Sequence, residues 1–147
     1  MKHTTLISSL LSCVVATGAL ALAPAAAAQN VSRTLQVNIP FAFQVDSQRM
    51  PAGIYHVDLL PSNVIELRGP TSRFVIAHSA ETLQKPSESK IVFDRYGSRN
   101  YLHQIWTAGN PLGRECSKSR AEKEAMLAQN NQPPTLVELA LIDETRR

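Results

Sequence analysis

Beyond residue 28 the chain contains a single thiol, Cys116, which could act as a nucleophile. His103 could serve as its base, because a cysteine nucleophile needs an imidazole within hydrogen-bond reach. No spacing in the sequence fixes that distance, and Gly113-Arg114-Glu115 before the thiol is not a cysteine-protease signature. A partly buried thiol without a chemical role is therefore the favoured interpretation.

Histidines on three different expected strands are the candidate metal ligands: His56, His78 and His103. Imidazoles on adjacent strands could converge on a zinc or copper ion. The sequence has no closely spaced pair of ligands and no His-Glu-x-x-His helix, so separate histidines that face solvent or bond a neighbour are favoured. We expect no metal and no cofactor.

Carboxylates on the expected strands are a further candidate. Asp58, Glu66 and Asp94 could pair as the two carboxylates of a glycosidase. Carboxylates at alternating strand positions are more often exposed to solvent, and that interpretation is favoured.

Aromatic residues of the strands are the best candidates for contact with a ligand. Amphipathic rings on one sheet face can stack on sugars while they keep a polar atom in water. Packing of the same rings in the core or across strands is the favoured alternative. The set comprises Tyr55, Tyr96, Tyr101 and Trp106.

The candidate ligand-binding site consists of Tyr101, Trp106 and Arg114. Trp106 ends an expected hairpin, and the loop after it, rich in glycine and proline, can bring backbone amides close to a ligand. Arg114 precedes a helix whose N-terminus favours anions, so a carboxylate or sulfate could find donors from both. The alternative is that Trp106 fills the core and Arg114 pairs with Glu115 or Glu122.

Strands must position these residues, and alternation is clearest from Leu35 to Val45. Apolar and polar residues alternate over this segment, which indicates a strand with one face on a core. Pro40 cannot donate to a sheet ladder, so the strand is expected to lie at an edge, to bulge, or to break in two there.

Further strands are expected between turn signals, over residues 54–60, 64–68, 73–79, 90–96, 101–106 and 135–142. Residues 107–118 contain two glycines and a proline and are expected to be irregular. Ser119 with Glu122 predicts a capping box, in which the hydroxyl and the carboxylate each satisfy a free amide. The short helix that follows is expected to end near Ala128 and to lie on the surface of the sheet.

Together these segments predict a mainly β fold, a small antiparallel sandwich or barrel with one short C-terminal helix. About six to eight short strands are expected. The strands show no βαβ alternation, which argues against a parallel sheet. Residues 29–147 are expected to form one domain.

Residues 1–28 predict a secretory signal peptide. Lys2 begins it, an apolar run extends from Leu6 to Ala23, and the last three residues before Gln29 are alanines. This run is near the lower limit for a spanning helix, so we expect cleavage, a secreted or periplasmic protein, and no transmembrane anchor afterwards. Cys116 would then be the one remaining cysteine, and a lone cysteine cannot form a disulfide within the domain.

Charge gives little sign of a nucleic-acid partner. The formal net charge of +3 falls to +2 when Lys2 is removed with the signal. Nucleic-acid binders concentrate Lys and Arg on one face or helix, whereas in this chain they are spread and interleaved with Glu. We therefore expect no nucleic-acid partner.

Several short motifs resemble a family of short exported bacterial proteins of unknown function. They comprise an Ile39-Pro40-Phe41 strand, a Pro51-Ala52-Gly53-Ile54-Tyr55 turn, and Ile105-Trp106 followed by Gly113-Arg114 before a charged helix. The match covers roughly residues 35 to 124, and the motifs are specific in combination. The resemblance implies export but supplies no activity and no catalytic residues.

The function expected from these observations is that of an uncharacterised exported domain, binding or structural and non-catalytic, at the cell envelope. Its expected partner is an envelope glycan, a small anion or another envelope protein. The alternative is an envelope enzyme that uses a histidine-bound metal or the Cys116 thiol. Between the two, the absence of a catalytic motif favours the binding domain.

Overall fold

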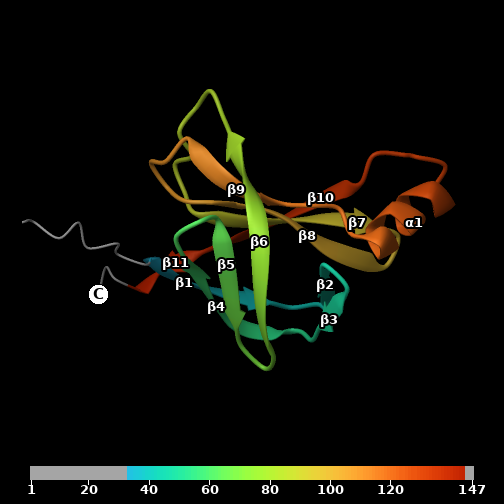
Figure 1. Cartoon of the computed structure of the whole chain (residues 1–147), viewed down its shortest axis with the longest axis horizontal. Helices are drawn as coiled ribbons and strands as arrows, with labels where there is room; N and C mark the ends of the chain where they lie inside the picture. The colour runs from blue at the N-terminus through green and yellow to red at the C-terminus, as the bar shows by residue number, and fades with distance from the viewer. Residues whose placement is uncertain (1–32, 145–147) are drawn as a thin grey trace, which may run out of the picture.

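The computed structural model describes residues 33–144, and it is mainly β with one short helix (Figure 1). The predicted signal peptide and Gln29 lie outside the described residues. The strands are β1 (Arg33–Ile39), β2 (Phe43–Val45), β3 (Gln48–Met50), β4 (Gly53–Leu59), β5 (Val64–Arg68), β6 (Ser72–Glu81), β7 (Lys90–Tyr96), β8 (Arg99–Trp106), β9 (Leu112–Cys116), β10 (Thr135–Ala140) and β11 (Ile142–Asp143). The helix is α1 (Arg120–Ala128).

The main path of the sheet runs β10-β7-β8-β9-β6-β5-β4-β1-β11. Strand β6 belongs to both layers of the sandwich and connects them. Residues 72–76 of β6 pair with β5, whereas residues 77–81 pair with β9. Figure 1 shows β6 running from the β4–β5 layer to the layer of β7, β8 and β9. The result is one open sheet folded into a small sandwich, as predicted from the spacing of the strands.

Pro40 breaks the predicted first strand in two, which is one of the three outcomes expected for it. β1 pairs with β4 up to Ile39, and β2 then starts at Phe43 and pairs with β3. β2 also makes a parallel contact with β8, where Gln44 lies opposite Tyr101. This one parallel contact departs from the otherwise antiparallel pairing of the described strands, because the chain crosses to the other layer after Pro40.

A chain of aromatic contacts links the two layers in the core. Phe93 meets Phe41 and Phe43, and Phe43 meets Tyr55, each pair edge-on with ring centroids 5.3 Å apart. Edge-to-face pairs of this kind stabilise a core beyond the area that they bury. Phe43, Phe93 and Tyr55 are almost wholly buried, and Phe41 is half-buried. The predicted alternation thus gives core residues on both sides of Pro40.

Two further boundaries differ from the sequence prediction. Residues 107–118 are not irregular throughout, because β9 lies within them and pairs with β6 and β8. The predicted last strand is divided into β10, which pairs with β7, and β11, which pairs with β1. Leu141, between them, is buried and donates its amide to the Ser89 carbonyl at 2.8 Å. The C-terminal strand therefore spans both layers.

Helix α1 begins at the predicted place, and the Ser119 hydroxyl accepts the Glu122 amide at 3.2 Å, which is one half of the predicted capping box. The Glu122 carboxylate accepts from Lys118 instead. Ala121, Ala125 and Met126 of its thin apolar face pack on two buried rings, Tyr96 and Tyr101. The small alanine side chains allow the helix to lie close to the sheet. The helix covers the outer face of β7 and β8 at one end of the molecule (Figure 1). Within residues 33–144, no helix is long and apolar enough to cross a membrane.

Candidate functional site

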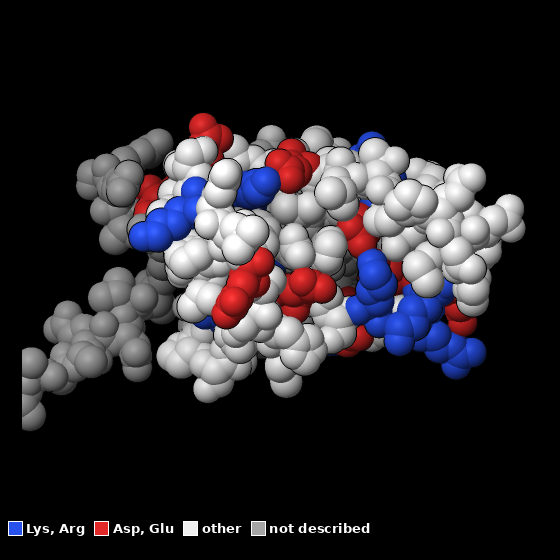
Figure 2. Space-filling view, turned by 90° about the horizontal axis from the view of Figure 1, so that it is seen from above, with Lys and Arg blue, Asp and Glu red and all other residues white. Residues whose placement is uncertain are grey.

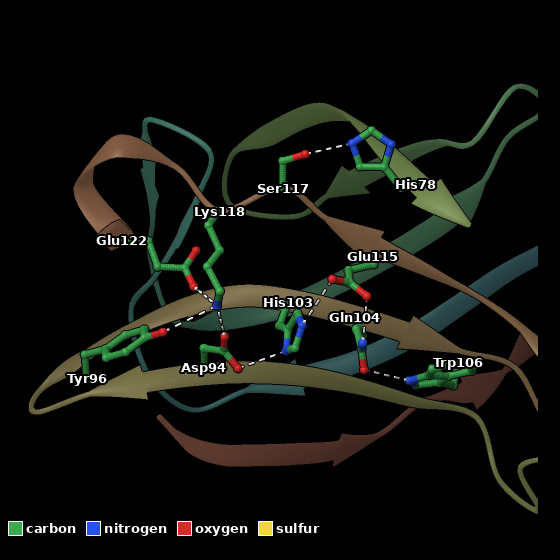
Figure 3. A network of polar contacts seen from close by, with 10 residues as sticks. All are labelled: His78, Asp94, Tyr96, His103, Gln104, Trp106, Glu115, Ser117, Lys118 and Glu122. Atoms are coloured by element: carbon green, nitrogen blue, oxygen red, sulfur yellow. Dashed lines mark hydrogen bonds and ion pairs between the residues drawn. The ribbon is translucent and has the colours of Figure 1, made fainter. Parts of the chain in front are cut away.

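A group of charged residues lies between β7, β8 and the start of α1 (Figure 3). We name this group the Asp94 cluster; it consists of Asp94, Tyr96, His103, Lys118 and Glu122. Asp94 and Glu122 are almost wholly buried, with side chains 1% and 5% exposed. Charged groups are rarely buried unless they are paired, so the partners of these two carboxylates decide what the cluster can do.

Lys118 supplies the main counter-charge. Its Nζ lies 2.6 Å from Asp94 Oδ2 and 2.8 Å from Glu122 Oε1, and it also donates to the Tyr96 hydroxyl at 3.4 Å. Burial lowers the pKa of Lys118, but its bonds to the two carboxylates outweigh burial and raise it overall. Lys118 therefore stays protonated at neutral pH and is unsuited to act as a base or a nucleophile.

His103 reaches Asp94 through a β-bulge. Phe93 pairs with Leu102 and Val92 pairs with Gln104, so His103 is the extra residue of β8 with no partner on β7. An extra residue bends a strand and redirects its side chain. The bulge places His103 Nδ1 2.9 Å from Asp94 Oδ1, although neither atom has a partner in regular hydrogen-bond geometry. The contact is thus an ion pair when the imidazole is protonated.

The pKa values in the cluster follow from this arrangement. Contact with Asp94 raises the pKa of His103 above its ordinary value, against the effect of burial. Burial raises the pKa of Asp94, but His103 and Lys118 together lower it overall. Burial raises the pKa of Glu122, and Lys118 only partly offsets this. With His103 protonated, two positive groups balance two carboxylates, so the cluster is neutral and its charges are mutually satisfied.

A second polar chain extends from His103 along β8 (Figure 3). His103 Nε2 lies 3.7 Å from Glu115 Oε1, and Gln104 donates to Glu115 Oε2 at 3.0 Å. Gln104 in turn accepts the indole N–H of Trp106 at 3.2 Å. Trp106 is 8% exposed, and its polar atom is already bonded, so the ring packs against the protein.

The three predicted ligand-binding residues occupy different places. Tyr101 lies beneath α1 and donates its hydroxyl to the Ala121 carbonyl at 3.2 Å. Trp106 covers Gly113, where a Cβ would come within 2.5 Å of the indole. Arg114 follows Gly113 directly on β9 and so projects from the opposite face of the strand. The structure therefore does not bring Trp106 and Arg114 together.

Arg114 points into the end of the sandwich and away from α1. Its Nη1 donates to the Val64 carbonyl at 3.0 Å, and burial lowers its pKa. A pocket of about 220 Å³ lies beside it, lined by Leu59, Asn63, Ser79, Ile105, Thr107, Asn110, Leu112, Gly113 and Arg114. Neither Glu115 nor Glu122, the partners expected for Arg114 in water, forms an ion pair with it among the described residues.

Cys116 belongs to the core. Its side chain lies with the buried residues between the layers and is 7% exposed. Burial, followed by the charges of Glu122 and Glu115, raises the pKa of the thiol to about 12. Glu115, the residue before it, faces His103 on the outside of β9, so Cys116 projects to the other face. A thiol in this state is a poor nucleophile.

The histidines have separate partners. His56 Nδ1 lies 3.3 Å from Glu144 Oε2, His78 lies 2.8 Å from the Ser117 hydroxyl, and His103 contacts Asp94. No group of three or more potential ligands that could hold a metal occurs in the part of the chain that the structure describes. The His78–Ser117 pair, drawn apart from the cluster in Figure 3, has the spacing of a base and a nucleophile but is exposed.

Sequence reasoning missed the Asp94 cluster. It treats Asp94 as a polar strand position, and the structure shows that this expected exposure is wrong because Lys118 and α1 cover the residue. A signal was present in the spacing of Lys118 and Glu122, four residues apart at a predicted helix start. Nothing local connects either residue with Asp94, more than twenty positions earlier.

Comparisons with protein-family models, with curated proteins and with solved structures give no match. The resemblance to short exported bacterial proteins therefore stays a prediction from the motifs.

Proposed function

We propose that this chain is an exported, non-catalytic binding domain of the cell envelope, in a bacterium. Export is supported by the signal-peptide pattern of residues 1–28. The resemblance to short exported proteins agrees with it. The fold agrees with a binding role, because binding residues often lie on loops that a rigid scaffold positions. A small sandwich holds its loops and hairpins in this way at the ends of its layers.

The observation that carries the non-catalytic part of the proposal is the state of Cys116. Its thiol is buried among core side chains, and its pKa of about 12 leaves a very small thiolate fraction at neutral pH. The other strong candidates for chemistry, Asp94 and Lys118, neutralise each other across the start of α1. Such pairing stabilises the fold and engages both of these groups.

A thiol-trapping experiment tests this proposal. The mature protein, residues 29–147, is treated with iodoacetamide at pH 8, native and in denaturant, and alkylation of Cys116 is followed by mass. A rise in pKa from 9.0 to about 12 lowers the thiolate fraction about a thousandfold, so native alkylation should be slower by at least two orders of magnitude. Fast alkylation of the native protein would favour a thiol enzyme instead.

A further inference from the structure

An open pocket of about 370 Å³ lies between the β2–β3 hairpin and the turn that joins β7 to β8. Its size is within the range of small-molecule sites, which are usually about 300 to 1,000 Å³. The residues that line it are Ala42, Phe43, Gln44, Arg49, Ser98, Arg99 and Asn100. The lining residues thus carry two guanidinium groups, two amides and a hydroxyl, with no carboxylate among them.

The pairing of the strands aims the two arginines at the same space. Arg49 lies opposite Gln44 across the β2–β3 hairpin, and Gln44 lies opposite Tyr101 of β8. Arg99 is two residues before Tyr101, so it projects from the same face of β8. Arg49, Gln44 and Arg99 therefore converge from three strands on one side of the sheet.

Both arginines are without a counter-charge. Arg49 and Arg99 are exposed, and within residues 33–144 neither forms an ion pair. Most other basic side chains at this end are engaged; Lys118 bonds Asp94, and Arg120 pairs with Glu124 at 2.9 Å. Figure 2 shows Lys and Arg side chains gathered at the end of the molecule that carries α1. An uncompensated pair of guanidinium groups favours an anion.

The wall of the pocket is fixed by Asn100, which is 5% exposed. Its amide donates to the Ala42 carbonyl at 3.1 Å, and its oxygen accepts from Arg95 Nε at 2.7 Å. The Arg95 guanidinium lies over the Phe41 ring, 5.3 Å from its centroid. These contacts hold the chain after Pro40 against the β7–β8 hairpin. The pocket is therefore already formed without a ligand, and a preformed pocket lowers the entropic cost of binding.

We infer that this pocket binds a phosphate monoester group through Arg49 and Arg99. Two guanidinium charges match the charge of a phosphate monoester, about −1.5 to −2 at neutral pH, better than the single charge of a carboxylate. Gln44 and Ser98 supply further polar contacts, and the remaining volume leaves room for the group that carries the phosphate. This inference rests on the proposed binding function and names the chemistry of the ligand.

Titration calorimetry of the mature protein at low ionic strength tests the inference, with inorganic phosphate and glycerol 3-phosphate as probes. Wild-type protein should bind both. Arg49→Gln and Arg99→Gln should each weaken binding about tenfold, and the double variant should abolish it. Arg120→Gln is the matched control, because it removes one positive charge from an exposed position on α1 and should change affinity less than twofold.

Vesicles of phosphatidylcholine with and without phosphatidic acid form a second arm. Binding that requires phosphatidic acid and both arginines would assign the phosphate to a lipid headgroup, whereas binding of the soluble probes alone would assign it to a free molecule. Failure of every phosphate probe, or equal weakening by Arg120→Gln, would overturn the inference. Binding of glucuronate in place of phosphate at the same arginines would overturn the phosphate assignment and leave the proposed binding function intact.

Discussion

Lys118 Nζ lies 2.6 Å from Asp94 Oδ2 and so joins the segment before α1 to the middle of β7. The same ammonium group bonds Glu122 in the first turn of the helix. One lysine therefore attaches α1 to the sheet at a point where the apolar contacts of the helix are limited to small side chains. Its removal would leave the buried carboxylate of Glu122 without its counter-charge and Asp94 with His103 alone.

Lys118→Met should lower the free energy of unfolding by about 2 kcal/mol. Breaking a buried pair costs about 3 to 5 kcal/mol, and the 37% exposure of the Lys118 side chain reduces this. Chemical denaturation of the variant measures the effect. Lys123→Met is the control, since Lys123 is exposed on the same helix and should change stability by less than about 0.5 kcal/mol. Equal effects at both positions would contradict the role given to Lys118.

Stability should fall as pH rises through the pKa of His103 in the folded protein. Contact with Asp94 raises that pKa above 6.5, so the stabilisation is complete below 6.5 and is lost at higher pH. Asp94 has a lowered pKa, so its contribution is present above about 3.8 and is lost as pH falls through the folded value. Glu115, Glu122 and Lys118 also face the pair, and all three are present in wild type and in the His103→Gln variant described next.

Urea unfolding of wild type and His103→Gln across pH 5 to 9 isolates the histidine. The wild-type protein should lose more stability than the variant above pH 6.5, because only it contains the His103 imidazole, whose pKa the contact with Asp94 raises. Parallel pH profiles would show that the 2.9 Å contact with Asp94 does not stabilise the folded state.

Phe43→Ala should destabilise the protein by about 3 to 5 kcal/mol, because the ring is 1% exposed and contacts both Phe93 and Tyr55. Phe41→Ala should cost less, since Phe41 is half-buried. Guanidinium denaturation compares the two. A loss below about 1 kcal/mol at Phe43 would mean that the aromatic chain is not central to the core.

Gly113→Ala should displace the indole of Trp106. A Cβ at this position would lie 2.5 Å from the ring, and a fused ring cannot bend away as a flexible chain can. We expect a red shift of Trp106 fluorescence and a lower melting temperature. Trp106→Leu in the Gly113→Ala background should recover part of the lost stability, and a failure to recover any would place the strain elsewhere.

The sequence predicts the strands of this fold well where apolar residues alternate, as from Leu35 to Ile39, and the helix start where Ser119 caps an amide. It fails at β9, because the glycine that suggests a loop, Gly113, is a strand residue that makes room for Trp106. The alternation of apolar and polar residues does not show which face of β9 points into the core. In the structure the core-facing side of β9 carries Cys116. These features depend on contacts between distant segments.

The candidate site was harder to predict than the fold for the same reason. A bulge at His103 changes where its side chain points, and no local pattern marks the extra residue. Arg49 and Arg99 fall in ordinary turns of the sequence prediction, fifty positions apart, and only the parallel contact between β2 and β8 brings them to one pocket. Pairing between strands that are far apart in the sequence determines the direction of the His103 side chain and the meeting of the two arginines. No local sequence pattern encodes that pairing.

The central claim, that the chain is an exported binding domain, is tested most directly by native mass spectrometry of the protein recovered from its own host. The account predicts protein in the periplasm or medium with a mass that begins at Gln29 and with a non-covalent adduct that denaturation removes. Protein of the full length of 147 residues in the cytoplasm, or mature protein without an adduct, would contradict it.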